Sequence, residues 1–436
     1  MPLSNGALRS VGCAVVVAGC ATAGLAGAQV ASAAAPPKTP PGTYAYITDL
    51  GGNDMKVINT ATNTVTATIP LSGGPIGVAV TADGRQVYAT NSFANTVSVI
   101  DATTETVTGS ITVGNDPQAV ALSPDGKQAF VANDGSGTVS VISTATQAVT
   151  GTITVGAHPE AVAFSPDGSH AYVSNTVSNT VSVISTSSDT VTATVNTGAT
   201  PLGLVVTPDG SHVWVADVGN GTISVIATAD NSVSTINTGG SPYGVTESSD
   251  GKTIYVTDRE TNLLEVINAA TQTVTASVAT GQAPEQVALT PDGSHAYIAD
   301  LNDGAVSVID VTTQTAGPPI VVGNGPLGVA IGTIVQNATT LTAGTGHLSL
   351  LPLGVTGLNA TLTSNGSPVP GETITFTATD GTRLCSAVTN ASGRAACNAV
   401  PPILTTVGVL LGGYQATFAG DTYYKPSSAH GALALL

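Results

Sequence analysis

Short runs in which Val, Ile and Thr alternate with small or polar residues recur along most of this chain. One set consists of GVAVT from residue 77, QVYAT from 86, TVSVI from 96 and TVTGSITV from 106. Alternation with a period of two is typical of β-strands with one buried face, whereas an amphipathic helix needs a period near 3.6. The pattern therefore predicts an all-β protein built from short strands.

The four runs repeat as one unit of about 42 residues. Asp-Gly pairs begin at 83, 125, 167, 209, 250 and 292, which are steps of 42, 42, 42, 41 and 42 residues. A proline lies eight residues before each pair, at 75, 117, 159, 201, 242 and 284, and Pro326 follows in register. Four strands in a repeat of this length are typical of a β-propeller blade, and Asp-Gly suits the tight turn between its first two strands.

The ends of the repeat region predict the blade count and the closure of the ring. One aromatic residue occupies the same second-strand position in each unit: Tyr46, Tyr88, Phe130, Tyr172, Trp214, Tyr255 and Tyr297. Residues 44–70 supply the second, third and fourth strands of a blade, and residues 326–335 supply a first strand alone. We therefore expect a seven-bladed β-propeller closed by a three-plus-one clasp of these two segments, because closure removes exposed strand edges.

The second strands carry a further motif. They end in YITD, YATN, FVAN, YVSN, WVAD, YVTD and YIAD, with Asp-Gly hairpins before most of them and VSVI-like runs after. This pattern resembles the YVTN β-propeller repeat family over residues 44–335. The resemblance implies the propeller fold and an exported, cell-surface or surface-layer protein. More distantly, it implies kinship with lactonase-like and lyase-like enzymes on related propellers.

The 42-residue period stops at Asn337, and shorter strands between Gly and Pro turns follow. NGSPVPGETITFTA and YQATFAGDTYYKPSSA resemble bacterial immunoglobulin-like repeats, so residues 336–436 are expected to form a small β-sandwich. Cys385 and Cys397 lie in two predicted strands joined by the turn NASG. We predict a disulfide that staples this hairpin, because no neighbouring His or Cys has zinc-ligand spacing.

Residues 1–35 have the composition of an export signal. Arg9 is their charged residue, residues 11–18 are apolar, and Ala31-Ser32-Ala33 is a small-residue cleavage site; residues 36–43 would then be a linker. A lipoprotein anchored through Cys20 is the alternative, because VAGC has the form of a lipobox. A spanning helix fits the Gly content poorly, and we expect no transmembrane segment in the mature chain. The protein is thus predicted to be secreted or at the cell surface.

Charge restricts the class of partner. The chain has 10 Lys and Arg against 27 Asp and Glu, a formal net charge of −17, and 8% of its residues are charged. Such a chain repels phosphates, so we expect no nucleic-acid partner. We expect the partner to be a protein or glycan at the cell surface. We also expect the chain to be a monomer.

The residues that flank the seven prolines include the candidate binding residues, because in a propeller these loops surround the mouth of the central channel. Most flanking residues are small or aliphatic, and the exceptions are Asp116, Gln118, His158, Glu160, Tyr243 and Glu285. Asp116, His158 and Glu160 come from adjacent blades, so they are candidates for sharing a cation or a polar ligand. Solvated loop charges explain them equally well.

Other polar residues are harder to place. Glu247 is a further candidate ligand-binding residue at the channel rim. It occupies a slot that is apolar in six other blades, so it either faces the channel with a raised pKa or is exposed by a local twist. His170, His212 and His295 start second strands in different blades and are expected to lie apart. Arg259 and Glu260 are expected to form an exposed salt bridge.

No serine elbow, P-loop, dinucleotide fingerprint or HExxH pattern occurs in the sequence. We therefore favour a non-enzymatic exported binding protein that presents a propeller face to a partner, with no cofactor. The alternative is a lactonase-like hydrolase or lyase centred on the channel, with a divalent cation held by Asp116, His158, Glu160 or Glu285. A third hypothesis, a structural array, predicts self-association.

Overall fold

The computed structural model describes residues 39–350, 353–400 and 412–436. The predicted export signal, with Cys20, lies outside the described residues, as does the start of the predicted linker at residues 36–38. The first strand begins at Gly42, two residues before the predicted start of the propeller. The regular secondary structure of the described chain is almost entirely β-strand, as the alternating pattern predicts.

Residues 42–334 form seven antiparallel sheets, which we number as blades from the N-terminus, with strands given from the innermost outward. Blade 1 is β29 (Pro326–Ile334), β1 (Gly42–Asp49), β2 (Asp54–Asn59) and β3 (Thr64–Pro70); blade 2 is β4 (Pro75–Val80), β5 (Gln86–Asn91), β6 (Thr96–Asp101) and β7 (Thr106–Thr112); blade 3 is β8 (Pro117–Leu122), β9 (Gln128–Asn133), β10 (Thr138–Ser143) and β11 (Ala148–Thr154). Blade 4 is β12 (Pro159–Phe164), β13 (His170–Asn175), β14 (Thr180–Ser185) and β15 (Thr190–Asn196); blade 5 is β16 (Pro201–Val206), β17 (His212–Asp217), β18 (Thr222–Ala227) and β19 (Val233–Asn237). Blade 6 is β20 (Pro242–Glu247), β21 (Thr253–Asp258), β22 (Leu263–Asn268) and β23 (Thr273–Ala279); blade 7 is β24 (Pro284–Leu289), β25 (His295–Asp300), β26 (Ala305–Asp310), β27 (Thr315–Ala316) and β28 (Ile320–Val321). Two short 3₁₀ helices, η1 (Ser92–Ala94) and η2 (Asp134–Ser136), lie between second and third strands.

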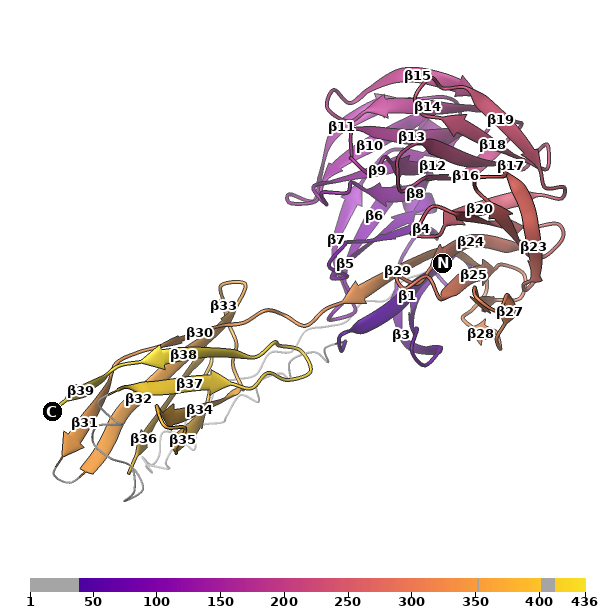
Figure 1. Cartoon of the computed structure of the whole chain (residues 1–436). Coiled ribbons are helices and arrows are strands. Elements are labelled where there is room, and N and C mark those ends of the chain that lie inside the picture. Colours follow the sequence, from indigo (N-terminus) through magenta and orange to yellow (C-terminus); the bar gives the residue numbers. More distant parts are fainter. Residues whose placement is uncertain (1–38, 351–352, 401–411) are drawn as a thin grey trace, which may run out of the picture. The chain divides into compact units, whose positions relative to one another are not determined.

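The sheets form a closed ring. The inner strands contact one another in the order β29, β4, β8, β12, β16, β20 and β24, and β24 contacts β29 again. Figure 1 shows these strands at the centre and outer strands such as β15, β19 and β23 at the rim. The predicted clasp is confirmed, since β29 pairs antiparallel with β1 and sets Tyr46 opposite Ala330. The fold is therefore a β-propeller whose first and last repeat segments share one sheet.

The second-strand aromatic residues lie in the packing layers between blades. All seven are buried, and the largest, Trp214, is 2% exposed and packs with residues of blades 5 and 6. Tyr297 also links blade 7 to blade 1, because its hydroxyl donates a hydrogen bond to Asn63 Oδ1 at 2.5 Å. The periodic aromatic position is therefore a core position, as the repeat indicates.

One face of the propeller carries the turns between first and second strands, and we call it the hairpin face. In blade 3, the Ser123 hydroxyl and the Lys127 amide both donate to Asp125 Oδ1, at 2.8 and 3.0 Å. Gly126 follows with φ +68°, a left-handed conformation that glycine adopts without steric cost. The same aspartate bonds recur in the hairpins of Asp83, Asp167, Asp209, Asp250 and Asp292.

The opposite face carries the loops that end on the seven prolines and the loops between second and third strands, and we call it the mouth face. In each blade, the backbone N–H that follows the second strand donates to the carbonyl that precedes the proline. The pairs are Leu50–Gly325, Ser92–Gly74, Asp134–Asp116, Thr176–His158, Val218–Thr200, Arg259–Ser241 and Leu301–Ala283, at 2.9–3.2 Å. This repeated bond fixes the two kinds of loop against each other around the channel.

The C-terminal region forms two further sheets. One contains β30 (Thr340–Ala343), β32 (Leu353–Ser364), β31 (Gly346–Leu350) and β39 (Leu433–Leu435), with β33 (Ser367–Pro368) and β36 (Arg394–Ala399) also paired to β32. The other contains β35 (Arg383–Val388), β34 (Thr373–Ala378), β37 (Tyr414–Phe418) and β38 (Ser427–Gly431). Both contribute to one apolar core that includes Leu362, Phe376 and Phe418. This is a two-sheet sandwich, and its immunoglobulin-like character stays a prediction.

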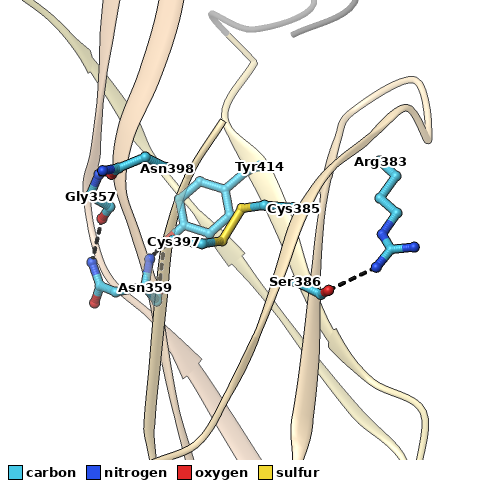
Figure 2. Close-up of a disulfide and its surroundings, with 8 residues drawn as sticks. All are labelled: Gly357, Asn359, Arg383, Cys385, Ser386, Cys397, Asn398 and Tyr414. Atoms are coloured by element: carbon cyan, nitrogen blue, oxygen red, sulfur yellow. Dashed lines mark hydrogen bonds between the residues drawn. A yellow bond between two sulfur atoms is a disulfide. The ribbon is translucent and has the colours of Figure 1, made fainter. Parts of the chain in front are cut away.

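The disulfide between Cys385 and Cys397 is present, with the two Cα atoms 6.5 Å apart. It does not staple a hairpin, so that prediction was wrong. Strand β35, with Cys385, pairs with β34, whereas β36, with Cys397, pairs with β32 in the other sheet. The turn NASG is therefore a corner between the sheets, and the disulfide links them (Figure 2). Tyr414 beside it adds a second link, because its hydroxyl donates to the Asn359 carbonyl of β32 at 2.7 Å.

Candidate functional site

The residues that directly follow the seven prolines line one cavity at the mouth of the channel. Its volume is about 160 Å³, and it also contacts the next residues along the inner strands. In ring order from blade 1, the seven residues are Leu327, Ile76, Gln118, Glu160, Leu202, Tyr243 and Glu285. The polar residues thus form two arcs, blades 3 and 4 and blades 6 and 7, which aliphatic residues separate.

Glu285 is the most deeply buried acid of the cavity, with 1% of its side chain exposed. Arg259 reaches it from the blade 6 loop, with Nε 3.1 Å from Glu285 Oε1, and the guanidinium lies 5.5 Å from the centre of the Tyr243 ring. Burial raises the pKa of Glu285, and Arg259 and Tyr243 partly counteract this. Neither carboxylate oxygen has a donor in hydrogen-bonding geometry among the described residues. Glu285 therefore keeps acceptor capacity that the protein does not use.

Glu160 lies in the other polar arc, and no positive charge faces it within the described residues. Burial is the main cause that raises its pKa to about 8, and repulsion from Asp134, Asp116 and Glu285 adds to the shift. Its carboxyl makes no hydrogen bond within the part of the chain that the structure describes. Near neutral pH this carboxyl therefore keeps its proton.

The proposed trio of Asp116, His158 and Glu160 does not gather around one point. Asp116 accepts hydrogen bonds from the Ser92 hydroxyl and, at 2.7 Å, from the Gln118 amide. His158 is half exposed, and its Nδ1 lies 2.9 Å from Asp134 Oδ1. Only Glu160 of the three lines the cavity. Asp116 and His158 instead belong to pairs between neighbouring blades.

Glu247 lies at the far end of β20 from Tyr243, away from the residues that line the cavity. Burial raises its pKa to about 8, and repulsion from Asp209 of the neighbouring hairpin adds to the shift. One of its oxygens is buried without a hydrogen-bond partner among the described residues. A raised pKa was one expectation for Glu247, but its place is near the hairpin face rather than in the channel mouth.

Several of these residues are of types that bind metal ions. Within residues 39–350, 353–400 and 412–436, no three His, Cys, Asp or Glu side chains converge as a metal site requires. His170, His212 and His295 each interact through Nδ1 with the preceding serine hydroxyl, at 2.7–2.8 Å, in three separate hairpins. The prediction that these histidines lie apart is thus correct.

Sequence reasoning missed the partner of Arg259, which is Glu285 and not Glu260. The sequence does contain a signal for this pair, namely the number of residues that separates partners on neighbouring blades. The first residue after a second strand reaches the proline loop of the next blade, as Ser92 reaches Asp116 and Asp134 reaches His158, each 24 residues on. Arg259 follows the same rule with a separation of 26, because its side chain is longer. Applying this offset to the repeat would have paired Arg259 with blade 7.

A search of the described residues for a helix long and apolar enough to cross a membrane finds none.

Comparison with known proteins supports the fold. Residues 87–171 match the family model described as a YNCE-like beta-propeller. No curated protein matches the chain. Hydrazine synthase of Kuenenia stuttgartiensis is similar in structure, with a TM-score of 0.58 and 24% identity over 66% of this chain and 99% of that one.

Two further solved structures show the same likeness. A functionally unknown protein from Desulfotomaculum acetoxidans has a TM-score of 0.60 and 19% identity, over 66% of this chain and 98% of that one. A putative 6-phosphogluconolactonase from Bacteroides uniformis has a TM-score of 0.57 and 20% identity, over 66% and 99%. At these identities the likeness concerns the fold alone. The chain is therefore a β-propeller protein.

Proposed function

We propose that this chain is an exported, non-enzymatic binding protein that presents the mouth face of its propeller to a protein or glycan at the cell surface. In this proposal, the C-terminal sandwich spaces or docks the propeller. The observation that carries the proposal is the place where the repeat varies. On the hairpin face, the aspartate-glycine turn is nearly invariant from blade to blade, whereas on the mouth face the equivalent loop positions differ in charge, size and polarity.

The mouth face also exposes apolar side chains. Phe93 and Val177, in the second-to-third-strand loops of blades 2 and 4, are 76% and 64% exposed. Their equivalents in blades 3 and 5 are Gly135 and Gly219. Exposed apolar groups beside a polar cavity are typical of surfaces that bind partners.

The charged groups of this face support binding more than catalysis. Asp134 pairs with His158, Glu285 pairs with Arg259, and Asp116 accepts two hydrogen bonds. A hydrolase of the lactonase-like type would need a nucleophile or metal site with open acidic and basic groups. One of the similar structures is named as a putative 6-phosphogluconolactonase, so lactone hydrolysis is the activity that an experiment has to exclude.

The test compares two double variants on arrays of immobilised peptides and glycans. Phe93→Ser with Val177→Ser alters the mouth face, and Lys127→Ser with Lys252→Ser alters exposed pairs on the hairpin face. We expect the first to reduce binding at least tenfold and the second to leave it unchanged. Equal loss in both variants contradicts the assigned face.

A lactone-hydrolysis assay with calcium, magnesium or manganese tests the enzymatic alternative. Metal-dependent turnover that Glu160→Gln abolishes would overturn the proposal.

Light scattering at rising protein concentration tests whether the protein is a monomer, as we expect. An increase in the measured mass would favour the hypothesis of a structural array.

A further inference from the structure

We propose that the channel mouth binds a primary ammonium group on an aliphatic stem, such as the side chain of a lysine in the partner. The inference rests on the proposed function in one respect, that a partner supplies the lysine. The site itself consists of the cavity formed by the residues that follow the seven prolines.

The cavity is compact, with a volume of about 160 Å³. A butylammonium group, which is the end of a lysine side chain, has five heavy atoms. A group of this size fits between the seven lining positions.

The cavity is lined partly by aliphatic and partly by polar side chains. Leu327, Ile76 and Leu202 supply aliphatic surface, whereas the remaining four positions of the ring supply oxygen or amide groups. Acceptors and aliphatic surface in one small cavity match a ligand with a donor head and an apolar stem. A hydrated metal ion would gain nothing from the aliphatic positions.

The carboxylates in the cavity have few donors. Glu285 is 1% exposed, and Arg259 and Tyr243 are the side chains that act on it, yet neither of its oxygens has a partner in good hydrogen-bonding geometry among the described residues. Glu160 faces it from the other polar arc and makes no hydrogen bond within the described chain. An ammonium group has three donors and no acceptor, so it satisfies such oxygens without adding an unpaired one.

The excess of acidic side chains around Glu160 also favours a cationic ligand. The groups that act on Glu160 are Asp134 of η2, Asp116 of the blade 3 proline loop and Glu285 of β24, all of them acids. The nearby basic side chains are engaged, since Arg259 pairs with Glu285 and His158 interacts with Asp134. A ligand cation would supply the missing charge and stabilise the ionised Glu160. The net charge of −17 also attracts cationic partners from a distance.

This arrangement couples binding to pH. Without a ligand, burial holds the pKa of Glu160 at about 8, so the carboxyl is neutral at lower pH. Binding of a cation must then release a proton, so below pH 8 the affinity rises about tenfold for each unit by which the pH is increased. The ammonium ligand itself stays charged up to a pKa of about 10.

The experiment is calorimetric titration of the full mature chain with n-butylammonium at pH 6, 7 and 8. Each titration is run in two buffers that differ in ionisation enthalpy. We expect saturable binding, an affinity that rises about tenfold per pH unit, and release of up to one proton per ligand. n-Butanol, which has the same shape without the charge, should not bind. Equal binding of butanol, pH-independent binding or no saturable binding overturns the inference.

Variants locate the site. Glu160→Gln should lower the affinity at pH 8 at least tenfold and remove the pH dependence, because Gln carries no proton to release. Gln is the native residue at the equivalent position 118, so this variant is expected to fold. Asp125→Asn on the hairpin face is the matched control and should bind as the wild type does. Undiminished binding by the Glu160 variant overturns the inference.

A second arm separates this inference from the proposed function. Peptides that bind the mouth face are compared with copies in which every lysine is acetylated. We expect acetylation to reduce binding at least tenfold. Peptides or glycans that bind the mouth face with no need for lysine would overturn the ammonium inference and leave the binding function in place. If butylammonium binds but no peptide or glycan on the arrays does, the ammonium inference stands and the proposed binding function is overturned.

Discussion

The two faces of the propeller treat their carboxylates in opposite ways. On the hairpin face, the pKa values of five aspartates are lowered to about 2, namely Asp125, Asp167, Asp209, Asp250 and Asp292. The Lys127 side chain is the main cause at Asp125, Lys252 adds to the shift at Asp250, and in every hairpin a hydroxyl and a backbone N–H donate to the carboxylate. On the mouth face, burial raises the pKa of Glu160 to about 8, and that of Glu285 is also raised. One face satisfies its acids locally, and the other leaves acceptor capacity unused.

This difference shows how a repeat protein separates stability from function. The hairpin acids bond within their own turn, so every blade can repeat the same solution. The mouth acids depend on residues of other blades, as Glu285 depends on Arg259. A site of this kind can arise only where blades differ from one another. Four predictions test the contrast, from the largest expected effect to the smallest.

The hairpin face should tolerate change except where the ring closes. Gly84 and Gly126 occupy equivalent hairpins, with φ +69° and +68°, but a Cβ on Gly84 would lie 2.3 Å from the Thr333 carbonyl oxygen of β29, whereas a Cβ on Gly126 meets nothing within 4 Å. Gly126→Ala should cost about 1 kcal/mol of unfolding free energy from backbone strain alone. Gly84→Ala should cost about 3 kcal/mol, because overpacking against the clasp adds to the strain. Urea unfolding measures both, and equal costs would show that the clasp does not limit stability.

The buried pair of the mouth face should be sensitive to loss of its cation. Arg259→Met leaves Glu285 buried without a countercharge, and we expect a loss of about 2 kcal/mol in urea unfolding. Adding Glu285→Gln should restore part of it, because the charge is then removed. The matched hairpin-face change, Lys127→Met, removes a cation that is 81% exposed and should have no measurable effect. Equal stability of all three variants would contradict the contrast between the faces.

Glu247 lies near the hairpin face, but unlike the hairpin aspartates it has a raised pKa and a buried oxygen without a hydrogen-bond partner among the described residues. Its removal should therefore stabilise the protein. The equivalent residues in blades 3 and 7 are Leu122 and Leu289, so Glu247→Leu fits a slot that already accepts leucine. We expect a gain of about 1 kcal/mol at pH 7. The folded pKa is about 8 against 4.5 for the ordinary group, so the gain should be small at pH 4.5 and grow towards pH 8. Destabilisation, or loss of butylammonium binding, would show a role for this carboxylate that its position does not explain.

The smallest expected effect concerns one hairpin acid. The pKa of Asp125 is about 2 in the folded state against 3.8 for the ordinary group, so its stabilising contribution is complete above pH 3.8 and is lost as the pH falls towards 2. Asp125→Asn should therefore lower the melting temperature slightly at pH 5, with the difference from wild type vanishing near pH 2. Thermal unfolding across this range measures the effect. A difference that does not change with pH would show that the aspartate acts through shape and not through charge.

Much of the fold followed from periodicity. The spacing of Asp-Gly pairs and prolines predicts the four-stranded unit, and the incomplete units at residues 44–70 and 326–335 predict the clasp that the sheet pairing confirms. These features repeat, so one local rule explains all blades. The hairpin around Cys385 and Cys397 was wrong because alternation indicates strands but does not say which sheet each strand joins.

The candidate site was predicted in part. The position of Glu160, Tyr243 and Glu285 after their prolines placed them correctly at the channel mouth, because each inner strand starts there. Asp116 and His158 were assigned to the same point, yet their side chains turn to partners on the preceding blade. A side chain's direction depends on neighbours that come from another repeat, and adjacency in sequence does not reveal them.

The sequence by itself determined the repeated strands, the closure of the ring and the residues that differ between blades, since all of these are local patterns of side-chain type. Tertiary structure alone decided which differing residues meet. Arg259 pairs with Glu285 across two blades, and Glu160 and Glu285 face one cavity from different arcs of the ring. The reason is geometric, because closing the ring brings to one axis residues that lie more than a hundred positions apart in the chain.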